Sequence, residues 1–247
     1  ISASLVNAGD SLAVQGSISL SPARRFTVES DEPRYWRVGG YDRYTGDGWV
    51  RTGKVTPYRE YALSNPPGQR RRIEQTFEAE SDIGIVPAAW KPVRYQGGPD
   101  VLVTRHDGLQ PEGGLESGDS YQVESAVIDA SEAELRDAGE DYPDEVTERY
   151  VQLPDSTPDR VTETTATLTE NAETPYQIAL TIERWLKRNR DYSLEVSQPR
   201  RNVADRFLHA MTAGYCTYFA TTMAVMLRTQ DIPARMTVGY TPAESPG

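Results

Sequence analysis

The sequence predicts an α+β protein, with a β-rich N-terminal domain at residues 1–150 followed by a helical core at residues 151–247. Short stretches that alternate apolar and polar residues, separated by glycine and proline turns, fill the first part and predict antiparallel strands. In the second part, apolar residues recur at helical spacing behind helix-start signals. An acidic stretch poor in apolar residues, at about 129–150, is predicted to be the linker between the two domains.

Strand-like stretches follow one another from the start of the chain. Two aromatic stretches flank a strong turn signal at 45–48 and predict a hairpin. The glycine pair Gly39-Gly40 is expected to end the strand before it. Many short strands with frequent turns are typical of an antiparallel sandwich or a barrel-like module. The predicted strands are 12–20, 25–29, 35–38, 41–44, 49–51, 72–78, 101–104 and 121–128.

Four helices and two strands are predicted after residue 150. Thr157-Pro158 and Thr174-Pro175 are helix-start signals, in which proline takes the first helical position and Thr157 is a possible cap. An apolar stretch without proline begins at Cys216 and predicts a helix as far as Arg228. The predicted helices are 159–171, 175–190, 202–209 and 216–228, and the predicted strands are 192–196 and 235–240.

The chain is acidic, with a formal net charge of −11 and an isoelectric point near 4.8. Nucleic-acid binding depends on basic patches that meet phosphates, so this charge argues against a nucleic-acid partner. The basic residues are nearly all arginine, since the only lysines are Lys54, Lys91 and Lys187. An acidic surface poor in lysine suggests a halophilic protein that stays soluble in high salt. The alternative is a generic acidic protein from a GC-rich genome.

No stretch of the sequence approaches the roughly 18 apolar residues of a membrane helix, and no basic-then-apolar signal segment opens the chain. The chain starts at Ile1 rather than at methionine, so we expect a soluble piece of a longer protein. One cysteine cannot form an intrachain disulfide, and composition therefore leaves the redox compartment open.

Cys216 is the only cysteine and the first candidate for chemistry. It follows Gly214-Tyr215 and occupies the first turn of the predicted helix. A helix N-terminus offers unpaired N–H groups and a partial positive charge, and both favour the thiolate over the thiol. Because the thiolate is the nucleophile, this position makes Cys216 a candidate for catalysis. The alternative is a buried, inert thiol, which is the commoner role of a lone cysteine.

The stretches around this cysteine resemble the transglutaminase-like superfamily. They read Gly-Tyr-Cys-x-x-Phe-Ala at 214–220, Met-Leu-Arg at 226–228 and Ile-Pro-Ala-Arg-x-x-x-Gly-Tyr at 232–240. Within the superfamily, the sequence is most similar to the extracytoplasmic region of membrane-anchored bacterial and archaeal proteins of the TgpA type. The resemblance implies a papain-like core with a Cys-His-Asp triad, in which Cys216 is the nucleophile. Residues 151–247 would supply the front part of that core, namely its helices, its nucleophile helix and its first strand.

The resemblance also implies a function. A thioester between Cys216 and a carboxamide or peptide carbonyl of a protein or peptide substrate would be resolved by an amine or by water, without a cofactor, at the extracytoplasmic face of the cell membrane. The family's His and Asp would lie after Gly239-Tyr240, so the core is expected to be truncated before those strands and inactive as this chain. Two alternatives are a non-catalytic extracellular interaction module with a degenerate core, and a cysteine peptidase.

Three neighbours of the thiol and two histidines complete the candidate site. Gly214, Tyr215 and Tyr218 flank the thiol and are predicted to line an acyl groove. His209 is expected to be a surface or capping residue rather than the general base, and His106 lies in a turn of the N-terminal part. Neither histidine has a cysteine or a carboxylate at the spacing of a metal site, so no metal is predicted.

Overall fold

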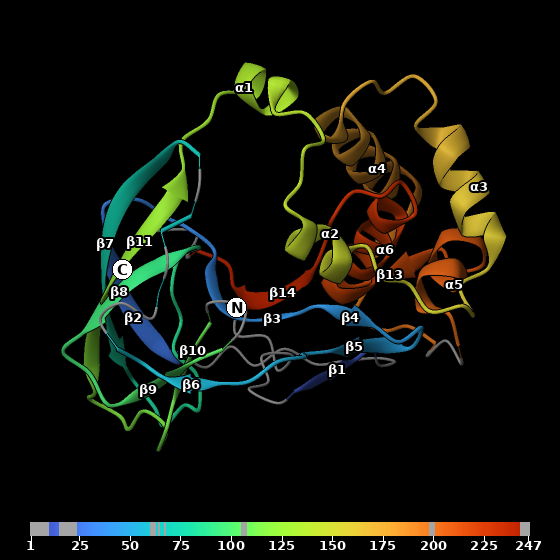
Figure 1. Cartoon of the computed structure of the whole chain (residues 1–247). Helices are drawn as coiled ribbons and strands as arrows, with labels where there is room; N and C mark the ends of the chain where they lie inside the picture. Colours follow the sequence, from blue (N-terminus) through green and yellow to red (C-terminus); the bar gives the residue numbers. More distant parts are fainter. Residues whose placement is uncertain are drawn as a thin grey trace.

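The computed structural model describes residues 10–14, 24–59, 63, 65–66, 68–104, 108–197 and 201–242 of a mixed α+β protein (Figure 1). Strands dominate the chain up to residue 128 and helices dominate it afterwards, as the sequence predicts. The strands are β1 Ser11–Ala13, β2 Phe26–Ser30, β3 Trp36–Tyr41, β4 Arg43–Tyr44, β5 Gly48–Val50, β6 Thr56–Pro57, β7 Arg70–Ala79, β8 Pro92–Gln96, β9 Val101–Val103, β10 Leu109–Pro111, β11 Ser120–Ile128, β12 Asp191–Tyr192, β13 Ala213–Gly214 and β14 Met236–Tyr240. The helices are α1 Glu132–Asp137, α2 Asp144–Tyr150, α3 Asp159–Leu168, α4 Pro175–Asn189, α5 Val203–His209 and α6 Cys216–Arg228.

The largest sheet has four antiparallel strands in the order β2-β7-β11-β8, at the left of Figure 1. Its strand β7 alternates exposed positions with buried ones such as Ile73 and Phe77. The Phe77 ring stacks on Tyr121 of β11 with 5.1 Å between ring centroids, and Trp36 packs edge-on against Phe77. The alternation that predicted these strands therefore places one face of the sheet on an aromatic core.

A tight hairpin joins β4 and β5 at the predicted turn. The Thr45 N–H donates to the Gly48 carbonyl at 3.0 Å, and Gly46 has a φ of +94°, which glycine adopts without steric penalty. β1 pairs with the other side of β5, so Trp49 lies in the central strand of a three-stranded sheet. β1 covers only the start of the first predicted strand, and positions 15–20 lie outside the described residues.

The helices begin close to their predicted positions. Thr174 and Gln177 form a capping box at α4, in which each side chain accepts a hydrogen bond from the backbone N–H of the other residue. The bounds of α6 are those predicted. The prediction of a Thr157 cap for α3 is wrong, because Pro158 is the N-cap residue and no side chain of the described residues caps this helix.

The strand β14 pairs antiparallel with β3, and the two run between the large sheet and the helices in Figure 1. The predicted break at Gly39-Gly40 is wrong, because both glycines lie within β3 and their backbone pairs with Val238 and Thr237 of β14. On β14, a Cβ at Gly239 would lie 2.2 Å from the Trp36 carbonyl oxygen, so only glycine allows this close approach. The pairing connects the N-terminal strands to the helical core.

A second core lies between the helices and the strands β1, β4 and β5. The buried side chains of Tyr44 and Trp49 belong to the same apolar cluster as Phe207 of α5 and Val225 of α6. The Trp49 indole Nε1 also donates to Thr221 Oγ1 of α6 at 3.0 Å. Packing between the first and second parts of the chain is therefore extensive, and the division into domains at residue 150 stays a prediction.

Candidate active site

Cys216 is the first residue of α6, and it is exposed. The preceding Tyr215 has an extended backbone, with φ −104° and ψ 179°, so the chain turns into the helix at the cysteine. The Tyr215 carbonyl accepts from the N–H groups of Tyr218 and Phe219. The N–H groups of Cys216 and Thr217 come before the first intrahelical bond and point out of the helix end. The sulfur thus lies beside the partial positive charge that the nucleophile prediction requires.

Gly214 leads the chain into α6 through a narrow space. A Cβ at Gly214 would lie 2.7 Å from Phe207 Cε2 and 2.9 Å from Tyr218 Cβ, and both of these aromatic side chains are fully buried. The same glycine belongs to β13, which pairs in parallel with β12. The strand predicted at 192–196 is shorter than expected, because its partner β13 has only two residues. Packing on one side and strand pairing on the other therefore hold the segment just before the thiol.

The two tyrosines predicted to line an acyl groove are fully buried. Their rings meet edge-on with 4.9 Å between centroids, and Tyr218 also packs against Phe207 at 5.6 Å. Burial raises the pKa of Tyr218 to about 12, so its phenol is neutral at physiological pH. Both rings therefore support the nucleophile helix from the inside, and an acyl groove lined by Gly214, Tyr215 and Tyr218 stays a prediction.

Two aromatic side chains, Tyr192 of β12 and Phe219 of α6, stack close to the start of α6. Tyr192 is 61% exposed, and its ring stacks on that of Phe219 with 6.5 Å between centroids and 22° between planes. Partial burial, and then the negative charge of the nearby Cys216 sulfur, raise the pKa of Tyr192. Sequence reasoning missed this residue, because no pattern in the sequence showed that β12 pairs with β13.

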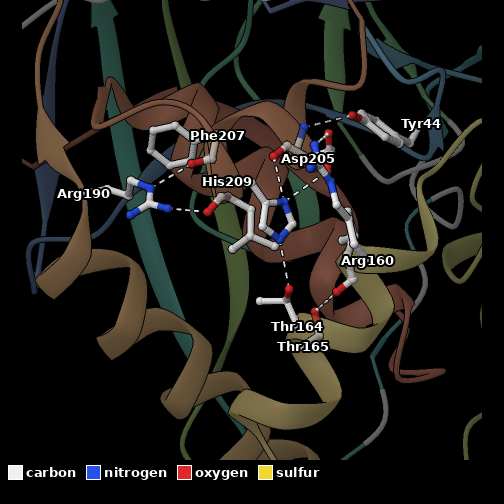
Figure 2. A network of polar contacts seen from close by, with 11 residues as sticks. Tyr44, Arg160, Thr164, Thr165, Arg190, Asp205, Phe207 and His209 are labelled. Atoms are coloured by element: carbon white, nitrogen blue, oxygen red, sulfur yellow. Dashed lines mark hydrogen bonds and ion pairs between the residues drawn. The ribbon is translucent and has the colours of Figure 1, made fainter.

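His209 belongs to a separate polar network, which Figure 2 shows. Its Nδ1 lies 3.0 Å from Asp205 Oδ1 and its Nε2 lies 2.9 Å from Thr164 Oγ1. The Asp205 carboxylate, with 6% of its side chain exposed, also accepts two hydrogen bonds of 2.6 Å from the Arg160 guanidinium. Both ring nitrogens of His209 are therefore used in capping and linking helices α3 and α5, as expected of a capping residue. His106 lies outside the described residues.

A hollow of about 340 Å³ opens beside β13. Its walls carry the charged side chains of Glu195 and Arg206 and the apolar side chains of Val196 and Met211. Ala213, which also lines the hollow, lies three residues before the thiol in the chain. The lining is therefore partly polar and partly apolar.

The described residues contain no group of three or more His, Cys, Asp or Glu side chains that could hold a metal ion. No helix within the same ranges is long and apolar enough to cross a membrane. Even α4 has 15 residues, fewer than the roughly 20 that span a bilayer.

The opposite end of α6 is held by Arg228, whose side chain is buried. Its guanidinium donates to the backbone carbonyls of Asp42 and Gln152, each at 2.6 Å, and to that of Ala234 at 2.8 Å from Nε. The group also lies over the Trp49 ring, 4.8 Å from the centroid. Burial lowers the pKa of Arg228 to about 10, which still leaves the guanidinium charged at neutral pH.

Two protein families match parts of this sequence. The transglutaminase-like superfamily matches residues 162–246, which begin within α3 and contain α4, α5, α6 and β14. The TgpA N-terminal domain matches residues 3–132, which contain the strands β1 to β11. The two matches together account for both parts of the described fold.

Crystal structures of the periplasmic domain of TgpA from Pseudomonas aeruginosa have a similar fold. One is 19% identical to this chain, with a TM-score of 0.68, and the alignment covers 98% of this chain and 83% of that one. A second, bound to ethylmercury, is 20% identical with a TM-score of 0.66, over 97% of this chain and 84% of that one. At these identities the likeness shows the fold alone.

The Bacillus subtilis (strain 168) protein YebA is 27% identical to this chain over 246 residues. The alignment covers 89% of this chain and 33% of YebA, so this chain spans about a third of the length of that relative. The similarity therefore concerns one region of a longer protein.

Proposed function

Because the chain belongs to the TgpA-type proteins of the transglutaminase-like superfamily, we propose that it is the extracytoplasmic part of a cysteine enzyme whose nucleophile is Cys216. The observation that carries the proposal is the exposed thiol at the first residue of α6, inside the stretch that matches the transglutaminase-like core. The alternative of a buried, inert thiol does not agree with an exposed Cys216.

The proposed reaction transfers an acyl group in two steps. The Cys216 thiolate attacks the carbonyl carbon of a carboxamide or peptide bond, and the π electrons of the carbonyl move to its oxygen. Collapse of this tetrahedral intermediate re-forms the carbonyl and expels the amine, which takes a proton from a general acid, and a thioester remains. An amine then gives a new amide, or water gives an acid, and the thiol is regenerated. The balance between these two acceptors depends on how well water is excluded.

This reaction needs a general base close to the thiol. His209 is a poor candidate, because its two ring nitrogens are bonded to Asp205 and Thr164. We place the base and its orienting carboxylate in the chain after β14, where the resemblance puts the family's His and Asp. In this proposal the described residues supply the nucleophile and its support, and a later segment completes the triad.

A protein or peptide is the proposed substrate, and the outer face of a membrane the proposed location. The hollow beside β13 offers Glu195 and Arg206 to a polar group and Met211 to an apolar one, as a peptide segment requires. The solved relatives are periplasmic domains, and we extend that location to this chain. In this proposal the two parts of the chain meet at residue 150: the strands before it form a supporting module, and the helices after it form the catalytic part.

The first experiment measures how fast iodoacetamide alkylates the native chain. We expect Cys216 to react at pH 7 at least about 10 times faster than N-acetylcysteine, because its sulfur is exposed beside the unpaired N–H groups at the start of α6. Cys216→Ser is the control that assigns the signal, since the chain has no other cysteine. A thiol that reacts only after unfolding would contradict the proposal.

The second experiment uses the full-length protein with a glutamine-containing peptide and a fluorescent primary amine. Amine incorporation indicates transamidation, whereas release of ammonia or cleavage without incorporation indicates hydrolysis or peptidase activity. Cys216→Ser is expected to abolish each of them. The engagement of His209 favours one other candidate, a non-catalytic interaction module, which would show none of these activities even though its thiol is exposed.

A further inference from the structure

The hollow beside β13 lies a short stretch of chain away from the thiol. Ala213 lines it and comes three residues before Cys216, and three extended residues span at most about 11 Å. A substrate whose carbonyl carbon meets the sulfur can therefore reach the hollow with about three of its own residues. The volume of about 340 Å³ is at the small end for ligand pockets, which measure roughly 300–1,000 Å³, so the hollow suits a short peptide segment.

Hydrogen bonds connect the lining of the hollow to the segment that leads into α6. The Glu195 N–H donates to Ser193 Oγ at 3.1 Å, and the Ser193 N–H donates to the Gly214 carbonyl at 2.9 Å. On the side of α5, the Met211 N–H donates to the Arg206 carbonyl at 2.9 Å. The lining is therefore held in place before any ligand binds, which lowers the entropic penalty of binding.

Two side chains of opposite charge line the hollow without pairing with each other. Among the residues that the structure describes, neither the Glu195 carboxylate nor the Arg206 guanidinium has an ion pair or a hydrogen bond. The preceding residue of α5 differs, because Asp205 accepts two hydrogen bonds of 2.6 Å from Arg160. Within the described chain, both charges at the hollow can therefore pair with a ligand.

The lining specifies the chemistry of that ligand. A guanidinium binds a carboxylate, and a carboxylate binds an ammonium or a guanidinium. The apolar side chains of Val196 and Met211 would contact the aliphatic stems of such groups. In an extended peptide, residues two apart point to the same face and lie about 7 Å from each other, so an acidic and a basic side chain at this spacing can enter the hollow together.

We propose that this hollow selects the peptide substrate, and that it takes a segment with one acidic and one basic side chain two residues apart. Arg206 binds the carboxylate of the segment, and Glu195 binds its cationic group. The inference rests on the proposed function and deepens it, because it names the class of peptide on which Cys216 would act. A purely acidic or purely basic segment would bring one of its charges next to a like charge, and an uncharged segment would gain neither ion pair.

The test measures how fast charged peptides label Cys216 in the native chain. Chloroacetyl peptides and peptide chloromethyl ketones both lose chloride to the thiolate, and they extend the peptide to opposite sides of the sulfur. Each set contains Glu and Lys in both orders at the second and fourth positions from the reactive group, and an uncharged peptide with Gln at both positions. At low concentration we expect one charged peptide to react about 3- to 30-fold faster than the uncharged one, which is the gain from two exposed ion pairs. Raising NaCl from about 0.1 M to about 1 M should remove most of this preference, because the Debye length falls from about 10 Å to about 3 Å.

A charge swap decides whether the hollow is responsible. The double variant Glu195→Arg with Arg206→Glu keeps the net charge and should invert the preference between the two orders of the charged peptides. The control swap, Glu163→Arg with Arg188→Glu, changes two exposed side chains on α3 and α4 and should leave the preference as in the wild type. Each rate is divided by that of the uncharged peptide in the same variant, which removes any change in the reactivity of the thiol itself. In the full-length enzyme, the swap at the hollow should raise KM for the preferred glutamine peptide and leave kcat nearly unchanged.

Each outcome decides between the claims. If all peptides of both sets label Cys216 at the same rate, or if the swap at the hollow leaves the preference unchanged, the hollow does not select the substrate, although Cys216 can still be the nucleophile. If the native thiol reacts with neither iodoacetamide nor any of the peptides, it is the proposed function that fails, together with this inference.

Discussion

The two ends of α6 have opposite environments. At its N-terminus, Cys216 is exposed, and so is Tyr192 of β12, the strand that pairs with the segment before the cysteine. At its C-terminus, Arg228 is buried and its guanidinium donates hydrogen bonds to the backbone carbonyls of three separate segments. One helix thus has a reactive end open to solvent and an anchored end inside the protein.

The difference shows how the fold can expose a thiol to solvent and still fix its position. The segments that Arg228 joins, at Asp42, Gln152 and Ala234, come from the β3–β4 connection, the start of the helical part and the loop before β14. The N-terminal end depends instead on shape, since Gly214 fits between two buried rings. The hydrogen bonds of the charged Arg228 therefore fix the buried C-terminal end of α6, and packing around Gly214 fixes its exposed N-terminal end.

Arg228→Met, at the buried C-terminal end of α6, should have the largest effect on stability. The substitution leaves the carbonyls of Asp42, Gln152 and Ala234 without their donor in a buried site. We expect a loss of about 3–5 kcal/mol in the free energy of unfolding, because each orphaned carbonyl is penalised while the removed charge no longer has to be desolvated. Urea unfolding followed by tryptophan fluorescence measures this loss.

Arg188→Met is the matched control, since Arg188 is exposed on α4, and it should change the free energy of unfolding by less than about 0.5 kcal/mol. Arg228→Lys should fall between the two, because one ammonium cannot reach all three carbonyls with the geometry of a guanidinium. Equal stability of the wild type and Arg228→Met would show that the buried end of α6 is not anchored by this side chain.

Gly214→Ala should have the next largest effect on stability, and it acts on the exposed N-terminal end of α6. Its new Cβ would lie under 3.0 Å from Phe207 and Tyr218, so these rings or the backbone must shift. We expect about 1–3 kcal/mol of destabilisation. The shift moves the start of α6, so the alkylation rate of Cys216 should fall as well. Gly113→Ala, at an exposed position where a Cβ meets no atom, is the control. If the alkylation rate of Gly214→Ala is unchanged, the packing around Gly214 does not set the position of the thiol.

Asp205→Asn should have the smallest effect. It changes α5, the helix that supports the N-terminal end of α6. Burial alone would raise the pKa of Asp205, but the hydrogen bonds and charge of Arg160, with a smaller contribution from His209, hold it below the ordinary value of 3.8. A lowered carboxyl pKa means that the ion pair stabilises the fold fully above about pH 3.8 and that this stabilisation is lost as pH falls through the lowered pKa.

We therefore expect Asp205→Asn to lose about 0.5–2 kcal/mol at pH 7 and to approach the wild type below pH 3. Unfolding curves at pH 7, 5 and 3 check this. Asp155→Asn changes an exposed carboxylate and should not change the pH dependence. A loss for Asp205→Asn that is the same at every pH would mean that the carboxylate acts through shape rather than charge.

Much of the fold could be predicted from the sequence, because its signals are local. The bounds of α6 follow from an apolar stretch without proline, and the start of α4 follows from the Thr174 cap and Pro175. The hairpin of β4 and β5 follows from the glycines of its turn. In each case the deciding interactions lie within a few residues of one another.

The errors concern interactions between distant segments. Gly39-Gly40 ends a strand by local propensity, but pairing with β14 keeps it in β3. Tyr215 and Tyr218 flank the thiol in sequence, yet the helical turn directs their rings into the core. Tyr192 lies beside the start of α6 only through the parallel pairing of β12 and β13, which no spacing in the sequence specifies. The position of Cys216 could thus be predicted, but its surroundings could not.

The pairing of β14 with β3 has a consequence for how this protein folds. The two strands are separated by about 200 residues, and closing a loop of that length carries a large entropic penalty before any contact compensates for it. Folding of this strand pair should be slow for a chain of this size. During synthesis β3 is made early and has to wait for β14 with one backbone edge unpaired. A chaperone that shields strand edges would therefore have most to protect at residues 36–41, until the residues after α6 have been made.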